Sequence, residues 1–345
     1  MDLIPYISDL VVTTQWLGKP LWMWLSFAGL VFALLALDLG VLHKGHREIG
    51  VRESLLLSAF YIALALLYGA WIWWGISAEA GLNYLTGFAV EKALAIDNVF
   101  VIAMIFSFFA VPPRYQHRVL FWGILGVIIL RALMIGLGAA IVSQFAWVLY
   151  VFAVFLIATG VKMLFASEKP TDIGNNPLVR FMRKNFRVTD EHHGERFFIR
   201  KTDKTNGQLQ RYMTPLFMAL VLIEVADVVF AVDSVPAIFA ITTDPFIVYT
   251  SNIFAILGLR ALYFALAAMV DRFAYLKTAL ALILLFIGTK IVVADTLELV
   301  HLPPWVSLVV TLVLLTLGVV YSLWRTRKAA EPEHQKASGE VAHRI

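Results

Sequence analysis

Nine mostly apolar stretches, each about 20 residues long and so able to cross a bilayer as a helix, run through this chain of 345 residues. Within the hydrocarbon core only α-helices and closed barrels satisfy every backbone N–H and C=O group. The stretches lie at 21–42, 54–76, 84–110, 119–142, 145–165, 214–241, 247–270, 275–294 and 305–324. We therefore expect an all-α polytopic membrane protein with about nine transmembrane helices.

The composition excludes an ordinary soluble domain and several kinds of chemistry. Hydrophobic residues make up 60% of the chain, charged residues only 15%, and the mean hydropathy is +0.80. Because there is no cysteine, thiol nucleophiles, disulfide exchange and thiolate metal sites are excluded. Motifs for ATP or a redox cofactor are missing from the sequence. We expect no enzyme activity, no resident cofactor and no nucleic-acid partner.

Basic residues outside the predicted spans gather on one side of the membrane. Alternate loops and the C-terminal tail hold 22 of the 28 Lys and Arg residues, five lie inside spans, and the other side has Lys19 alone. Since cytoplasmic loops retain Lys and Arg, this distribution predicts an external N-terminus and a cytoplasmic C-terminus. Residues 1–15 lack a signal-peptide pattern, so the first apolar stretch is expected to remain as a span.

An internal repeat is superimposed on this topology. The segment 95–99 (AIDNV) recurs at 231–235 (AVDSV), 130–133 (LRAL) at 259–262, and 160–162 (GVK) as GTK at 288–290. Each copy contains three spans, an odd number, so the second copy is inverted relative to the first. Many secondary transporters are built from such inverted repeats and bind substrate near the midplane.

The repeat divides the chain into six predicted regions. They are an N-terminal two-span region (1–83), repeat 1 (84–165), a cytoplasmic loop (166–213), repeat 2 (214–294), a final span (295–324) and a cytoplasmic tail (325–345).

Five carboxylates lie within spans of the two repeats: Glu91, Asp97, Glu224, Asp227 and Asp233. A charge at the bilayer centre costs about 2.5 to 3.5 kcal/mol on insertion scales, so such residues usually mark an ion path. Residues six apart on a helix are turned by about 120°, and for this reason one ion could contact both Glu91 and Asp97 only across a helix break. Pro236 supplies a breaker after Asp233, whereas the first repeat has none there.

These side chains are the candidate ligands of a hard divalent cation. Carboxylate, carbonyl and hydroxyl oxygens suit Mg²⁺, Ca²⁺ and Mn²⁺, whereas Zn²⁺ sites usually recruit His or Cys. Asn98 and Ser234 are further candidate oxygen donors, although each could equally satisfy a neighbouring backbone group. No His falls within a predicted span.

A structural alternative assigns the acids to ion pairs with Lys92, Arg131 and Arg260. Three cations cannot balance five carboxylates, but Arg131 and Arg260 individually are well explained as counter-ions or as ties between helices. Asp38, near the inner end of the first span, is either an exit-path residue or a helix cap. The long loop could form a two-stranded hairpin or contact the membrane surface, and the pair His192 and His193 is expected to be solvated.

The sequence resembles the TerC family, in particular its Alx-like members, from about residue 24 to residue 324. The resemblance is carried by EKALAIDNVFV, LRAL, EVADVVFAVDSVPAIFAITTDPFIV and SNIFAILGLRALYF. It implies a protein of the bacterial inner membrane, with a periplasmic N-terminus, related to LysE-superfamily exporters, some members of which are implicated in Mn²⁺ export. The acids of the family motifs fall on the five carboxylates named above.

Three functional hypotheses follow. The first is a Mn²⁺ exporter that binds the ion at the interface of the repeats, with proton exchange as the candidate coupling reaction. A second is a non-transporting redox modulator or partner protein linked to tellurite or stress resistance, acting through the cytoplasmic loop. A third is an exporter of a small organic cation such as a basic amino acid.

Overall fold

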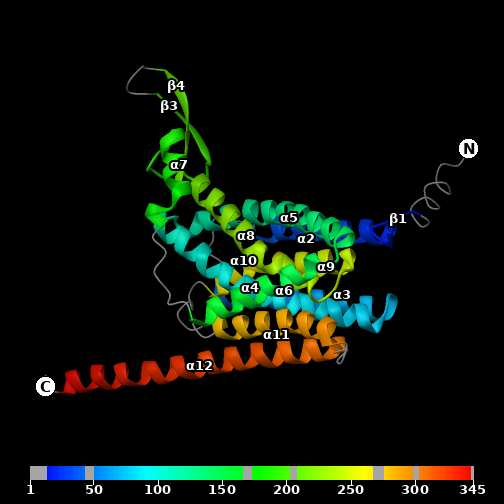
Figure 1. The fold of residues 1–345 in the computed structure, drawn as a ribbon. Helices are drawn as coiled ribbons and strands as arrows, with labels where there is room; N and C mark the ends of the chain where they lie inside the picture. Colours follow the sequence, from blue (N-terminus) through cyan, green and yellow to red (C-terminus); the bar gives the residue numbers. More distant parts are fainter. Residues whose placement is uncertain are drawn as a thin grey trace, which may run out of the picture.

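The computed structural model of the protein describes residues 14–42, 50–165, 173–202, 208–266, 276–297 and 303–342. Long helices lie side by side in one bundle, and a small arm projects from one end of it (Figure 1). The helices are α2 (Leu21–Leu42), α3 (Val51–Gly75), α4 (Ala78–Phe108), α5 (Pro113–Gln144), α6 (Val148–Phe165), α7 (Pro177–Asn185), α8 (Pro215–Phe239), α9 (Pro245–Leu257), α10 (Leu259–Leu266), α11 (Leu276–Leu297) and α12 (Pro304–Ala342), with the 3₁₀ turn η1 (Ile173–Asn175). Two antiparallel ribbons pair β1 (Gln15–Trp16) with β2 (Lys19–Pro20) and β3 (Phe198–Thr202) with β4 (Leu209–Met213).

Seven helices of the described residues are long and apolar enough to cross a membrane, with α9 and α10 counted as one span. The chain is therefore a mostly helical, multi-pass membrane protein. Of the nine predicted spans, those at α4 and α11 are not among the seven. Helix α4 contains three charged residues close together, Glu91, Lys92 and Asp97, and is excluded from the seven for this reason.

Helix starts follow the local sequence. Proline occupies the first turn of α5, α8 and α9, where its missing N–H leaves no bond unmade. Ser77 caps α4 by accepting a hydrogen bond from the Ala80 N–H, and Asp244 caps α9 by accepting one from the Phe246 N–H. The predicted hairpin in the long loop is present as β3 and β4.

Helix breaks occur elsewhere than expected. The 247–270 span was expected to be one helix, but it is divided at Gly258 into α9 and α10. A Cβ at Gly258 would lie 2.8 Å from Nζ of Lys92 and 3.2 Å from Cβ of Tyr61, so a larger residue here would displace the Lys92 ammonium and shift Tyr61. Between Glu91 and Asp97 no break exists, because α4 runs uninterrupted through both residues.

Helix α9 occupies the centre of the bundle. Nearly all of its residues are buried, including the polar Thr250, Ser251 and Asn252. Such an all-round apolar helix needs neighbours on every side, and α3, α4 and α5 all contact it. Its aromatic residues Phe246 and Phe254 pack into the core cluster formed with α2, α3 and α4.

Helices α6 and α11 make a reciprocal close contact through two glycines. A Cβ at Gly160 would lie 2.8 Å from the Ala281 carbonyl oxygen and 2.8 Å from Leu285. A Cβ at Gly288 would lie 2.8 Å from the Ala153 carbonyl oxygen and 2.8 Å from Ile157. These contacts bring the two backbones together in antiparallel orientation, a use of small residues typical of helix packing in membranes.

We expect Gly160→Ala and Gly288→Ala to destabilise the protein to a similar extent, by about 1 to 3 kcal/mol each, because each adds a methyl group against backbone atoms. The measurement is the thermal unfolding midpoint of the purified protein in detergent. Gly29→Ala is the matched control, since a Cβ there meets nothing within 4 Å. A loss of stability in only one of the two variants would contradict the reciprocal packing.

Candidate functional site

Arg131, in the middle of α5, joins carboxylates from two other helices. Its Nε and Nη2 donate to the two carboxylate oxygens of Asp227 on α8, each at 3.0 Å. Its Nη1 donates to Glu91 on α4 and, at 2.9 Å, to Oγ of Ser234 on α8. The side chains of Arg131 and Glu91 are both 1% exposed, so this is a buried ionic cluster. Such charges persist in a protein interior only when they are paired and hydrogen-bonded.

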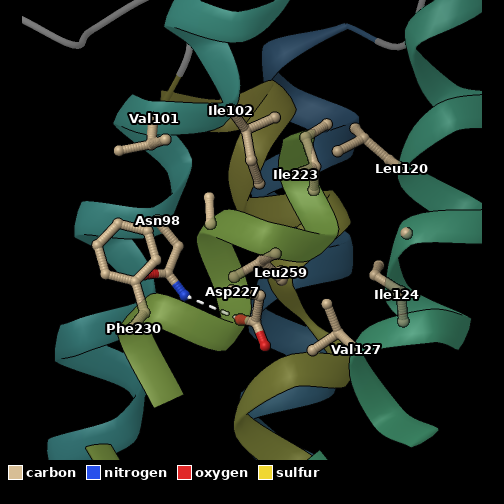
Figure 2. Close-up of a pocket in the computed structure, with 12 residues that line it drawn as sticks. Asn98, Val101, Ile102, Leu120, Ile124, Val127, Ile223, Asp227, Phe230 and Leu259 are labelled. Carbon is tan, nitrogen blue, oxygen red and sulfur yellow. Dashed lines mark hydrogen bonds between the residues drawn. The ribbon is translucent and has the colours of Figure 1, made fainter. Parts of the chain in front are cut away.

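The spacing along α4 and α8 explains which side chains meet. Glu91 and Asn98 are seven residues apart, as are Asp227 and Ser234, and seven residues bring a helix back to within about 20° of the same face. Each helix therefore turns one acid and one neutral polar residue toward the other. The Asn98 Nδ2 donates to Oδ1 of Asp227 at 3.4 Å, which links the two faces directly (Figure 2).

A small cavity begins at this link. Asn98 and Asp227 are its polar lining, and the rest is apolar residues of α4, α5 and α8 together with Leu259 of α10 (Figure 2). The apolar lining includes Val101, Leu120 and Phe230. The cavity thus extends from the ionic cluster toward the end of the bundle where α4 ends and α5 begins.

Glu224 lies on the same side of α8 as Asp227, as predicted for residues three apart. It fits against Gly126 of α5, where a Cβ would lie within 2.6 Å of all three carboxyl atoms of Glu224. Its Oε2 is buried and has no hydrogen-bond partner among the described residues. The missing side chain at Gly126 is therefore what makes room for this carboxylate.

Asp233 is not brought into the cluster. Asp233, one residue before Ser234, is turned away toward α6, where its Oδ1 accepts a hydrogen bond from Oγ1 of Thr159 at 3.4 Å. Asp97 directly precedes Asn98 on α4, and its side chain lies outside the described part of the chain. Within the described residues, no three His, Asp or Glu side chains are close enough together to hold a metal ion.

The remaining buried cations have separate partners. Nη2 of Arg260, on α10, donates to Oδ1 of Asp38 at 2.7 Å and to the Asp38 carbonyl oxygen at 3.1 Å. Lys92 donates to the Ala255 carbonyl oxygen at 3.2 Å, beside the break at Gly258. Asp38 therefore pairs with an arginine in another helix, a partner that sequence reasoning missed because no sequence spacing relates the two residues.

The arrangement can hold one cation between two carboxylates. Glu91, Asp227 and Arg131 together carry one net negative charge when all are ionised. Oxygens of Glu91, Asp227 and Ser234 already accept hydrogen bonds from Arg131, and Asp227 accepts another from Asn98, whereas Oε2 of Glu91 and Oδ1 of Asn98 are buried without a partner among the described residues. A second cation can bind to the same oxygens only if the guanidinium moves away from them.

The chain matches one family of known proteins. The family described as "Integral membrane protein TerC family" matches residues 76–330. A membrane protein of Rickettsia felis is 49% identical over 302 residues, which cover 88% of this chain and 97% of the relative. A membrane protein of Myxococcus xanthus is 47% identical over 307 residues, or 89% of this chain and 93% of the relative.

A third relative carries a functional name. This protein of Salmonella typhi, named as a proposed membrane-bound redox modulator, Alx, is 46% identical over 316 residues, or 89% of this chain and 95% of its own length. No solved structure matches the chain. The family match and the near-complete overlap with these relatives agree, and the chain therefore belongs to the TerC family of integral membrane proteins.

Proposed function

We propose that this protein exports Mn²⁺ across the bacterial inner membrane and binds the ion between α4 and α8. The observation that carries the proposal is the convergence of two carboxylates, an amide and a hydroxyl at one buried point, from Glu91, Asp227, Asn98 and Ser234. Oxygen donors of this kind suit Mn²⁺, and the site contains neither His nor Cys. The ion is the transported substrate.

The proposed architecture is nine spans with two inverted repeats, 84–165 and 214–294. Its support is the equivalence of contacts between them. Gly160 and Gly288 occupy matching repeat positions, 128 residues apart. Gly160 lies against Ala281 and Leu285, and Gly288 lies against Ala153 and Ile157, which are the residues 128 positions earlier. Likewise, α5 packs on α8 while α9 packs on α4. Reciprocal contacts of this kind are the mark of a two-fold relation. The N-terminus is then periplasmic and the C-terminus cytoplasmic.

Three acids of α8 lie in order along the proposed path. From the cytoplasmic end of the helix they are Glu224, Asp227 and Asp233, and their span of nine residues corresponds to about 13 Å along the axis. Glu224 would receive the ion from the cytoplasm, and Asp233 would pass it on toward the periplasm. Asp97, at the repeat position that matches Asp233, is the proposed counterpart on α4. The apolar side chains around the cavity beside Asp227 would close the ion path on the cytoplasmic side.

Arg131 would act as a resident cation that substitutes for the metal between transport events. The guanidinium and Mn²⁺ compete for the same oxygens, so the metal binds as Arg131 leaves and Arg131 returns as the metal is released. An unpaired buried carboxylate pair is costly, and the returning guanidinium removes that cost in the empty carrier. Protons are the proposed counter-ions, because the carboxylates can also be neutralised by protonation.

A second candidate function has one observation in its favour. The relative from Salmonella typhi is named as a proposed redox modulator. A chain without cysteine cannot exchange thiols itself, so this function would require an indirect effect, such as a change in cellular metal content. Export of a small organic cation is the third candidate. A guanidinium already fits the site, and lysine rather than Mn²⁺ would then compete for it.

We expect Glu91→Gln and Asp227→Asn each to weaken Mn²⁺ binding at least tenfold, or about 1.4 kcal/mol, because each removes a charged ligand. Isothermal titration of the purified protein measures the dissociation constant. Glu79→Gln, an exposed acid in the first turn of the same helix as Glu91, is the matched control and should bind as wild type does. Wild-type affinity in both site variants, or competition by lysine, would contradict the Mn²⁺ site.

We expect Arg131→Met to lower the unfolding midpoint in the absence of metal and Mn²⁺ to restore it. Without the guanidinium the two buried carboxylates are unpaired, which costs about 3 to 5 kcal/mol, and Mn²⁺ is then the cation that can pair them. The measurement is the midpoint with and without Mn²⁺. Arg118→Met is the control on the same helix, since its pair with Glu195 is partly exposed. Failure of Mn²⁺ to stabilise Arg131→Met more than wild type would contradict competition.

We expect Gly126→Ala to slow Mn²⁺ transport by at least fivefold, because the added methyl group would displace the Glu224 carboxylate. Uptake of Mn²⁺ into everted membrane vesicles gives the rate. Gly123→Ala is the matched control one turn earlier, where a Cβ would lie at ordinary contact distances of 3.7 Å or more. When Glu224→Gln is already present, adding Gly126→Ala should change the transport rate little. Additive losses would show that Gly126 acts independently of Glu224.

A further inference from the structure

The segment between α6 and α8 forms a projecting arm, made of α7 and the β3–β4 hairpin. Figure 1 shows the hairpin reaching away from the bundle across the direction of the long helices rather than along it. The arm leaves the bundle at the end where α4 ends and α5 and α8 begin. In a membrane protein this position is level with the lipid headgroups, beside the bundle.

The base of the arm is held firmly against the bundle. Val179 and Met182 of α7 are buried in the same core cluster as Leu216 of α8. A ring nitrogen of His192 lies 3.1 Å from the Phe109 carbonyl oxygen at the end of α4, and Arg118 of α5 forms an ion pair with Glu195 at 3.0 Å. These contacts fix the direction in which the hairpin leaves the bundle.

The hairpin carries an arrangement of cations that is unfavourable by itself. Arg200 and Arg211 are direct cross-strand partners, so two like charges stand side by side on one face of the ribbon. Among the described residues neither pairs with an acid, and the guanidinium of Arg211 lies over the Phe198 ring at 4.1 Å from its centroid. An anion bound between the two arginines would remove their repulsion.

Exposed hydrophobic side chains accompany these cations. Leu209, which pairs with Thr202 on the same face as the two arginines, is 65% exposed. On α7 and just after it, Phe181 and Phe186 are 57% and 46% exposed and pack edge to face against each other. The sequence from 176 to 213 contains nine Lys and Arg residues but only four Asp and Glu residues. Cations beside exposed apolar groups are typical of surfaces that bind at a membrane interface.

We propose that this arm lies on the cytoplasmic surface of the bilayer and binds the phosphate groups of anionic phospholipids, with Arg200 and Arg211 as the headgroup site and Leu209 inserted beside it. The direction of the hairpin favours a lipid surface over a nucleic acid or a soluble protein, because the arm extends over the lipid that surrounds the bundle. Basic residues near an anionic membrane surface are attracted to its headgroups. This proposal is independent of the transported substrate.

The test uses the absence of cysteine in the full-length chain. Thr202→Cys places a single thiol next to Leu209, where an environment-sensitive fluorophore can be attached. The labelled protein is placed in nanodiscs of phosphatidylcholine alone or with 30% phosphatidylglycerol. We expect a blue-shifted emission, and at least twofold more quenching by lipids that carry a shallow quencher, only in the anionic discs.

Arg200→Gln combined with Arg211→Gln should abolish this response, and the change removes a repulsive pair and so leaves the hairpin intact. A label at Glu79→Cys, at the opposite end of the bundle, is the control and should give the same signal in both kinds of disc. Equal signals from Thr202→Cys in the two discs, a response that survives loss of both arginines, or a shift produced only by added DNA would overturn the proposal.

Discussion

Arg131 and its two carboxylates hold together three helices that are far apart in the sequence. These three charged groups are buried away from bulk water, so each is stable only while the others remain in place. The guanidinium matches Asp227 through two parallel hydrogen bonds, a geometry that lysine cannot reproduce. The packing of α5 on α8 and the position of α4 beside them both depend on this ion cluster.

The two arginines at matching repeat positions differ in what they join. Arg131 ties together α4, α5 and α8, which all belong to the proposed repeats, whereas Arg260 ties α10 to Asp38 of α2, which lies outside them. The N-terminal helix thus supplies the carboxylate of Arg260, and this arginine does not share Glu91 and Asp227 with Arg131. In the part of the chain that the structure describes, Arg131 is therefore the one of the two that lies between acids of α4 and α8, although the sequence contains two copies of the LRAL motif.

Much of the fold could be predicted from the sequence, because apolar length and Pro or Gly punctuation are local properties. Most helices begin and end close to the predicted limits, and the hairpin in the long loop is present, but α12 continues to Ala342 instead of ending near residue 324 and the 247–270 span is divided at Gly258. The site was harder to predict. The spacing of six between acids draws attention, but the spacing of seven between Glu91 and Asn98, and between Asp227 and Ser234, decides which groups meet. Which helices face each other, and hence that Asp233 contacts Thr159 or Arg260 contacts Asp38, depends on tertiary packing alone.

The glycine contacts between α6 and α11 also determine how the two halves of the bundle can move. Where side chains interdigitate, a tilt between helices requires many rotamers to change together. At Gly160 the nearest neighbours are the Ala281 carbonyl oxygen and the Leu285 side chain, and at Gly288 they are the Ala153 carbonyl oxygen and Ile157, so few side chains interdigitate where the helices come closest. In the proposed transport cycle the α6–α11 pair would therefore serve as a fulcrum, about which one half of the molecule rocks while the distance between the two helix axes stays nearly constant.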